Sequence, residues 1–243
     1  VSDIRLGRVD TISHETNVRI NDATGENEIG IQEVVASNRP LFQNFGTRID
    51  NGVSYRSPVL GGFQGILTIG LNEDFKSTSS ATPPVTSKAS EYHGLGLIFG
   101  QGPFNAAVSY EEFSGGVVSG SYNKAVTVGA NYNFGLATVY AAYQNTSDFG
   151  PQLAAPTFAK GTDHDAYNVG VKVPYGNFTF KAQYTSSTVD RTGALSDLDQ
   201  EKYGLSAAYA LSKRTSVYAA VTERSGDLNR NFARRNEYVL GLG

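Results

Sequence analysis

The chain has 243 residues, of which 40% are hydrophobic and 18% charged, with 27 glycines, 14 tyrosines and no cysteine. Without cysteine it has neither a disulfide framework nor a thiolate metal site. The formal net charge of -3 argues against a general nucleic-acid binder, and no run of 18 apolar residues predicts a membrane helix. The alanines and tyrosines fall in alternating rather than helical patterns, which favours a protein built from strands.

Twelve strands are predicted from alternating apolar and polar residues bounded by turn residues. In chain order they are expected at 2–7, 52–58, 64–73, 92–100, 105–112, 124–134, 136–145, 166–173, 177–186, 202–211, 215–225 and 236–243. The connections between them alternate between short and long along the whole chain. An antiparallel up-and-down sheet would then have its tight turns at one end and its long loops at the other, which is typical of outer-membrane barrels.

Each predicted strand has one apolar and one polar face. Val126, Val128 and Ala130 share one parity, for example, whereas Thr127 and Asn131 share the other. A soluble sandwich buries the apolar face, whereas a membrane barrel turns the same alternation inside out. Periodicity alone does not separate these two alternatives.

Three further features favour the membrane barrel. Seven of the twelve predicted strands have 9–11 residues, about the length that a tilted strand needs to cross the hydrocarbon. No helix is strongly predicted outside the first long loop, so none is available to cover a sheet face. Aromatic residues also gather near the short turns, as an interfacial girdle would, at Phe63, Phe104, Tyr132, Phe134, Tyr175 and Phe178.

Two segments resemble a known family. The segments Ile4-Arg5-Leu6-Gly7-Arg8 and 48–58 (RIDNGVSYRSP), followed by Gly61-Gly62-Phe63-Gln64-Gly65, resemble the general diffusion porins of Gram-negative bacteria, most of all the β-proteobacterial type. The resemblance extends over essentially the whole chain, but its sharp motifs lie mostly within residues 4–65. It implies a homotrimeric barrel with a long third loop folded into the lumen.

Members of that family have sixteen strands, and the opening residues look like the fifth. We therefore expect an N-terminally incomplete porin in which about four strands precede Val1, and a last strand cut before the terminal aromatic residue typical of the family. A self-contained barrel of twelve strands is the alternative architecture, since an even number of strands can close.

The expected functional element is a constriction at residues 8–51, which is far longer than an ordinary hairpin loop. This acidic loop would face basic residues that strand parity directs into the lumen, with Asp3, Glu111 and Glu237 as acids of the wall. The predicted pore-lining or constriction residues are Arg5, Arg8, Glu15, Asp22, Glu26, Glu28, Glu33, Arg56, Glu111, Lys172, Lys181 and Arg224.

We therefore expect an outer-membrane porin, surrounded by lipid, for passive diffusion of small hydrophilic solutes and ions. Cations outnumber acids on the predicted wall, which favours anions. No catalytic residue, cofactor, metal or nucleic-acid partner is expected. The alternatives are a substrate-specific channel or an outer-membrane lipase that uses His93 with Ser90, although no nucleophile-elbow motif supports a lipase.

Overall fold

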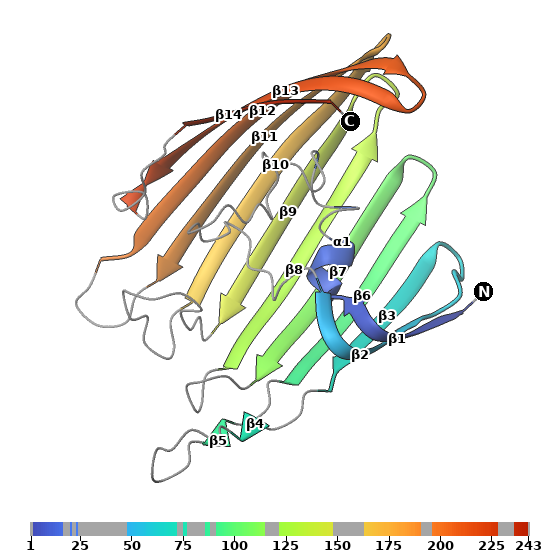
Figure 1. The fold of residues 1–243 in the computed structure, drawn as a ribbon, viewed down its shortest axis with the longest axis vertical. Coiled ribbons are helices and arrows are strands. Elements are labelled where there is room, and N and C mark those ends of the chain that lie inside the picture. Colours follow the sequence, from blue (N-terminus) through green and yellow to red (C-terminus); the bar gives the residue numbers. More distant parts are fainter. Residues whose placement is uncertain are drawn as a thin grey trace.

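The computed structural model describes residues 2–16, 20, 23, 48–71, 75–76, 86–87, 91–114, 122–147, 163–190, 196–227 and 236–242. Twelve strands form one antiparallel sheet in the order β1-β2-β3-β6-β7-β8-β9-β10-β11-β12-β13-β14 (Figure 1). Their bounds are β1 Asp3–Asp10, β2 Arg48–Arg56, β3 Phe63–Gly70, β6 Glu91–Gln101, β7 Phe104–Ser114, β8 Tyr122–Asn133, β9 Thr138–Ser147, β10 Asp163–Tyr175, β11 Phe178–Asp190, β12 Leu198–Ser212, β13 Thr215–Gly226 and β14 Asn236–Leu242.

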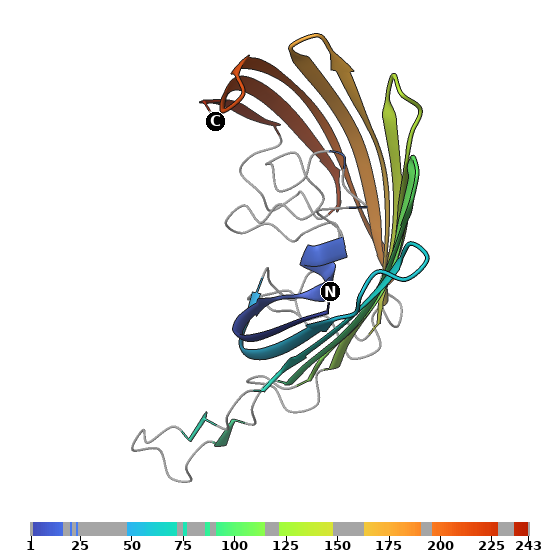
Figure 2. The same ribbon diagram turned by 90° about the vertical axis from the view of Figure 1, so that its right-hand side faces the viewer.

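The large sheet bends into an arc with a concave and a convex face (Figure 2). Within the described residues, β1 and β14 are its two edges, and each pairs with a single neighbour. The all-β, up-and-down antiparallel fold is therefore confirmed, and the twelve predicted strands match the twelve of this sheet. The number of strands in a closed barrel stays a prediction.

Two small elements lie outside the large sheet. A short pairing of β4 (Phe75–Lys76) with β5 (Thr86–Ser87) occupies the connection after β3, where the sequence predicted only a loop. Helix α1 (Ile12–Thr16) lies on the concave side of the sheet, as Figure 2 shows. Among the described residues, no helix is long and apolar enough to span a membrane.

The short turns all lie at one end of the sheet, as predicted (Figure 1). Between β2 and β3, Leu60 and Phe63 exchange backbone hydrogen bonds of 2.9 and 3.0 Å. The two residues between them are Gly61 and Gly62, with φ of 59° and 88°. A two-residue hairpin of this kind needs positive φ at both central positions, and glycine adopts it without a steric cost.

The convex face is apolar and the concave face polar. Leu95 and Leu97 of β6 point outward with 55% and 43% of their surface exposed, and Leu205 of β12 is 58% exposed. Thr127 and Asn168, on the opposite parity, are each only 1% exposed on the concave side. Exposed leucines over a whole sheet face are typical of a surface that contacts lipid.

Aromatic residues frame this apolar face on both sides. Near the short turns, the predicted girdle residues are exposed, and Tyr132 contacts Phe134 with ring centroids 4.6 Å apart. A second girdle, which the sequence analysis did not identify, lies toward the long loops and includes Tyr143 and Tyr167, whose centroids are 4.9 Å apart. The eight residue steps from Tyr167 to Tyr175 span roughly 20 Å along the membrane normal for a tilted strand, close to the roughly 25 Å apolar band of such barrels.

Several strands run further toward the long loops than predicted. Strand β10 begins at Asp163 rather than 166, β11 ends at Asp190 rather than 186, and β12 begins at Leu198 rather than 202. The added residues still pair in register, but their outward side chains are polar, as with Asp165 and Glu201. The apolar alternation therefore marks where a strand contacts hydrocarbon, whereas backbone pairing continues beyond it.

The two faces of β13 provide a matched test. Ala219 points outward and Ala220 inward. We expect Ala219→Lys to destabilise the folded protein in phospholipid vesicles by about 2–4 kcal/mol, because a charge on the lipid face near the midplane is costly. Ala220→Lys should cost far less. The folded fraction at each urea concentration is measured by electrophoresis without boiling, because a folded barrel migrates differently from the unfolded chain. Equal destabilisation by the two substitutions would contradict the assignment of the faces.

Candidate functional site on the concave face

The concave face carries helix α1, which begins where β1 ends. Thr11 caps the helix, because its Oγ1 accepts the His14 N–H at 3.3 Å and its carbonyl accepts the Glu15 N–H at 3.1 Å. A helix of five residues is not stable alone in water. Contacts with the sheet must therefore hold it in place.

Two side chains of the sheet anchor the first turn of α1. The Tyr92 hydroxyl of β6 accepts the Ile12 N–H at 2.8 Å and donates to Glu111 Oε1 of β7 at 2.5 Å. The same Glu111 oxygen accepts the Ser13 N–H at 2.9 Å. The first N–H groups of a helix have no partner within the helix, and here the Tyr92 hydroxyl and Glu111 accept two of them. A negative charge on Glu111 is also stabilised by the positive end of the helix dipole.

Two glycines of β6 make room for the helix. A Cβ added at Gly94 would lie 2.5 Å from Ile12 Cγ1, and one at Gly96 would lie 3.0 Å from Ile12 Cγ2. Ile12 is fully buried in this seat. The alternation of Gly94 and Gly96 with outward leucines is visible in the sequence, but it does not reveal which segment packs there.

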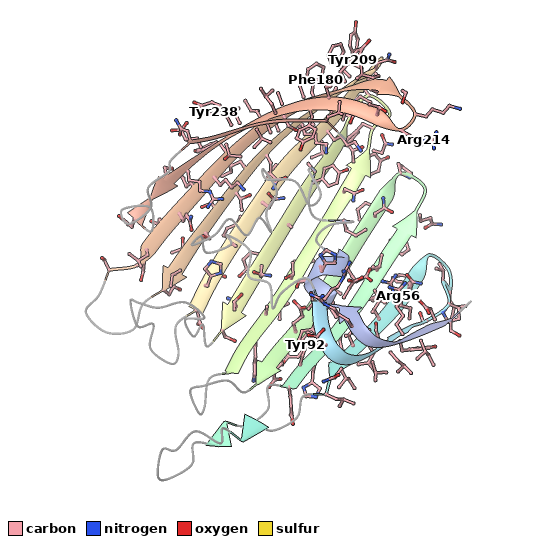
Figure 3. The ribbon with its side chains drawn as sticks, viewed as in Figure 1. Arg56, Tyr92, Phe180, Tyr209, Arg214 and Tyr238 are labelled. Atoms are coloured by element: carbon pink, nitrogen blue, oxygen red, sulfur yellow. The ribbon has the colours of Figure 1, made fainter. Side chains whose placement is uncertain are left out.

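An ion-pair cluster joins α1 to β1 and β2. Glu15 forms a salt bridge with Arg56, which is 7% exposed, and Figure 3 places Arg56 beside the helix. Arg5 Nη1 lies 3.7 Å from Glu15 Oε1, and Arg5 Nε lies 2.7 Å from Asp3 Oδ2. Asp10 accepts a 3.0 Å hydrogen bond from Arg48 Nε.

This cluster has balanced formal charges. Its three arginines meet three carboxylates, and each of the carboxylates lies within 4.0 Å of at least one arginine nitrogen. Of these residues, the sequence analysis named Arg5, Glu15 and Arg56 as lining the constriction, and the structure brings those three together. An ion at this side of the concave face therefore meets both signs of charge.

The opposite half of the concave face is basic. Lys172 of β10 pairs in register with Lys181 of β11, and Lys202 of β12 pairs in register with Arg224 of β13. On these four strands, all of whose residues are described, no inward position holds a carboxylate. Like charges directly opposite each other destabilise a sheet, so such pairs call for a functional explanation.

Lys202 was missed by the sequence analysis. It is 3% exposed and lies on the same parity as Gly204 and Ser206. Lys202 is the first residue of the strand predicted at 202–211 and shares the inward parity of Ser206, so parity alone would have identified it.

The other predicted site residues lie elsewhere. Arg8 is apart from the cluster, with its Nε 3.5 Å from Asp50 Oδ1 and both side chains largely exposed. Glu111 lies on the concave side as expected, but it is fully buried beneath α1. The predictions for Asp22, Glu26, Glu28 and Glu33 fall outside the described residues, as does the side chain of Glu237.

The segment beyond α1 follows the same concave face where it is described. The Asn131 Nδ2 of β8 donates to the Ile20 carbonyl at 2.9 Å. A Cβ added at Gly170 of β10 would lie 2.8 Å from Ala23 Cβ. Ile20 and Ala23 are 6% and 4% exposed, so these two residues pack against the concave side of β8 and β10.

Within the described part of the chain, neither a lipase site nor a metal site is formed. His93 is exposed on the convex side of β6, opposite Glu112 of β7 in register, and Ser90 falls outside the described residues. No group of three or more potential metal ligands occurs within the described ranges.

A curved up-and-down sheet with an apolar convex face, two aromatic girdles and a charged concave face defines the class of outer-membrane barrels. The sequence model of the Gram-negative porin family matches residues 2–229. The chain belongs to this family and thus to the bacterial outer membrane.

Individual porins are similar to this chain in sequence or in structure. Outer membrane porin protein 32 of Delftia acidovorans is 27% identical over 225 residues, which cover 89% of this chain and 58% of that protein. An anion-selective porin from Comamonas acidovorans superimposes with a TM-score of 0.64 at 23% identity, over 92% of this chain and 64% of its own. A porin refined at 1.8 Å resolution gives a TM-score of 0.66 at 16% identity, over 98% of this chain and 76% of its own.

The anchoring of α1 is tested by removing one hydroxyl. Tyr92→Phe deletes an acceptor for Ile12 and a donor to Glu111. Since a buried hydrogen-bond partner left unsatisfied costs about 1–3 kcal/mol, we expect amide exchange at Ile12 and Ser13 to accelerate by about tenfold or more. Hydrogen exchange with mass spectrometry measures this effect.

Tyr110→Phe is the matched control. Tyr110 also donates to a glutamate, with its hydroxyl 2.8 Å from Glu112 Oε2, but it lies on the convex face away from α1. The account of the anchor is wrong if both variants change exchange in α1 equally, or if neither does.

Proposed function

We propose that the protein forms a water-filled channel for passive diffusion of small hydrophilic solutes and ions, with a preference for anions. The chain spans 58% of its curated relative and 64% of the anion-selective porin. The proposal rests on one observation above the others, which is the basic concave wall of β10–β13 with Lys172, Lys181, Lys202 and Arg224.

The other half of the wall supports the same preference. At the α1 side, the charges of Arg5 and Arg56 are offset by nearby carboxylates, and that side contributes no strong net field. Among the described inward positions of the wall, the cations that face no carboxylate of the sheet are therefore those of β10–β13. An anion moving along the concave face would be attracted to this half, whereas a cation would be repelled from it.

The segment 8–51 is proposed to narrow the channel. Its support is the position of α1, Ile20 and Ala23 against the concave wall, together with the anchors at Tyr92, Glu111 and Asn131. The predicted acids Asp22, Glu26, Glu28 and Glu33 would then face the basic half. A field across the lumen would orient dipolar solutes. Assembly as a homotrimer is part of the proposal on the family resemblance alone.

Anion preference is tested with the double variant Lys172→Gln/Lys181→Gln. A univalent ion passing about 8 Å from one charge in water interacts by about 0.5 kcal/mol, and salt reduces this energy. Loss of two charges should therefore lower the anion-to-cation permeability ratio by about twofold or more. Reversal potentials of the protein reconstituted in planar bilayers, under a potassium chloride gradient, measure the ratio.

Lys124→Gln/Lys213→Gln removes two lysines from outside the concave wall and serves as the control, with an unchanged ratio expected. A wild-type protein that prefers cations would overturn the proposal. An unchanged ratio in the Lys172/Lys181 variant would show that these lysines do not set the preference.

A further inference from the structure

The convex face has a hollow over β11–β14. Ala207 of β12 and Ala219 of β13 are register partners, flanked in the same row by Phe180 and Leu240. The adjacent rows carry larger side chains, including Leu205 on the side of the long loops. The hollow has a volume of about 830 Å³ and a nearly wholly apolar lining, which includes Phe180, labelled in Figure 3.

The hollow continues towards the short turns. A smaller one of about 230 Å³ adjoins it, lined by Tyr209 and Val217, which form the next row of register partners. Strand β12 then ends in the turn to β13. The two hollows thus form one apolar track that points at this turn.

The turn at the end of the track holds two exposed cations, Lys213 and Arg214 (Figure 3). The Arg214 N–H donates to Ser212 Oγ at 3.1 Å, which orders the turn. All five short turns are described, and the other four contain no charged residue. Among the five described short turns, positive charge is therefore confined to the one at the end of the apolar track.

The spacing of the two features matches half a bilayer. Lys213 lies six residue steps after Ala207, which is roughly 15 Å along the membrane normal for a strand tilted by about 40°. The hydrocarbon core is about 30 Å thick, so Ala207 lies near its midplane when the turn is at the headgroups. A lipid whose phosphate contacts the turn would reach the hollow with its acyl chain.

We propose that this surface binds an anionic phospholipid of the periplasmic leaflet, with its phosphate at Lys213 and Arg214 and an acyl chain in the hollow beside Ala207. Short turns face the periplasm in outer-membrane barrels, which sets the leaflet. Basic residues at the headgroup level attract anionic lipids. A neighbouring copy at the same depth complements the site poorly, since none of the five described short turns carries a carboxylate.

Native mass spectrometry of the folded protein in detergent, titrated with phosphatidylglycerol or phosphatidylcholine, tests the proposal. We expect one phosphatidylglycerol to be retained in preference to phosphatidylcholine. Lys213→Gln/Arg214→Gln should weaken phosphatidylglycerol binding by about tenfold or more, since each cation near an anionic headgroup contributes about fivefold. Ala207→Phe fills the hollow and should weaken binding of both lipids.

Ala130→Phe is the matched control, because Ala130 is an outward alanine of β8 paired with Ala106 and Ala141, far from the hollow. The proposal falls if wild type binds both lipids equally, or if Ala207→Phe behaves as the control does. It also falls if Ala207→Phe dissociates an oligomer while lipid binding persists, since the hollow would then be a contact between copies. These variants leave the concave face intact, so conductance tests the channel separately.

Discussion

The fold depends on the need of every backbone N–H and C=O group in hydrocarbon to find a protein partner. An antiparallel sheet satisfies these groups between neighbouring strands, and in lipid only closed barrels and helices meet the requirement fully. The continuous register from β1 to β14 is the consequence, with a shift between Gly7 and Val9 as one of its few irregularities. Once pairing is fixed, each side chain faces either lipid or the concave side, and a one-residue slip would exchange the two.

This sidedness determines where charge occurs. Between the two aromatic girdles, the outward positions of the described strands hold no charged residue, whereas the concave face holds both the ion-pair cluster at α1 and the basic wall of β10–β13. Tyrosines mark the boundary at the long-loop side. Tyr143 donates to Asp165, and Tyr184 donates to Glu201 at 2.9 Å, so carboxylates begin where the rings end. Charged side chains, which lipid excludes from the convex face, are thus concentrated on the concave face.

The sequence predicted the parts of this structure that follow from local alternation. All twelve strands, the short turns and the inward direction of Arg56, Lys172 and Lys181 could be derived from parity and turn residues. Strand ends were less accurate, because Asp165 and Glu201 interrupt the apolar pattern without interrupting the pairing. Lys202 was missed although it lies within the predicted strand, on the inward parity of Ser206.

Contacts between distant segments could not be derived in this way. Tyr92 and Glu111 are 80 and 98 residues away from the N–H groups that they bind, and nothing in their own strands indicates a helix. Parity placed Glu111 on the inner face but could not tell an anchor of α1 from an acid exposed to the lumen. For Arg5 and Arg56, likewise, strand parity predicted that the side chains point inward. It could not predict the carboxylates that neutralise them, because those are brought close only by the tertiary structure.

The claim that the concave face meets water and the convex face meets lipid is tested most directly by cysteine scanning. The chain has no cysteine, so single cysteines at positions 204–209 of β12 can each be labelled alone. With the protein in vesicles, a membrane-impermeant charged thiol reagent should react at 204, 206 and 208 and spare 205, 207 and 209. Reaction at every position, or the opposite alternation, would contradict the account.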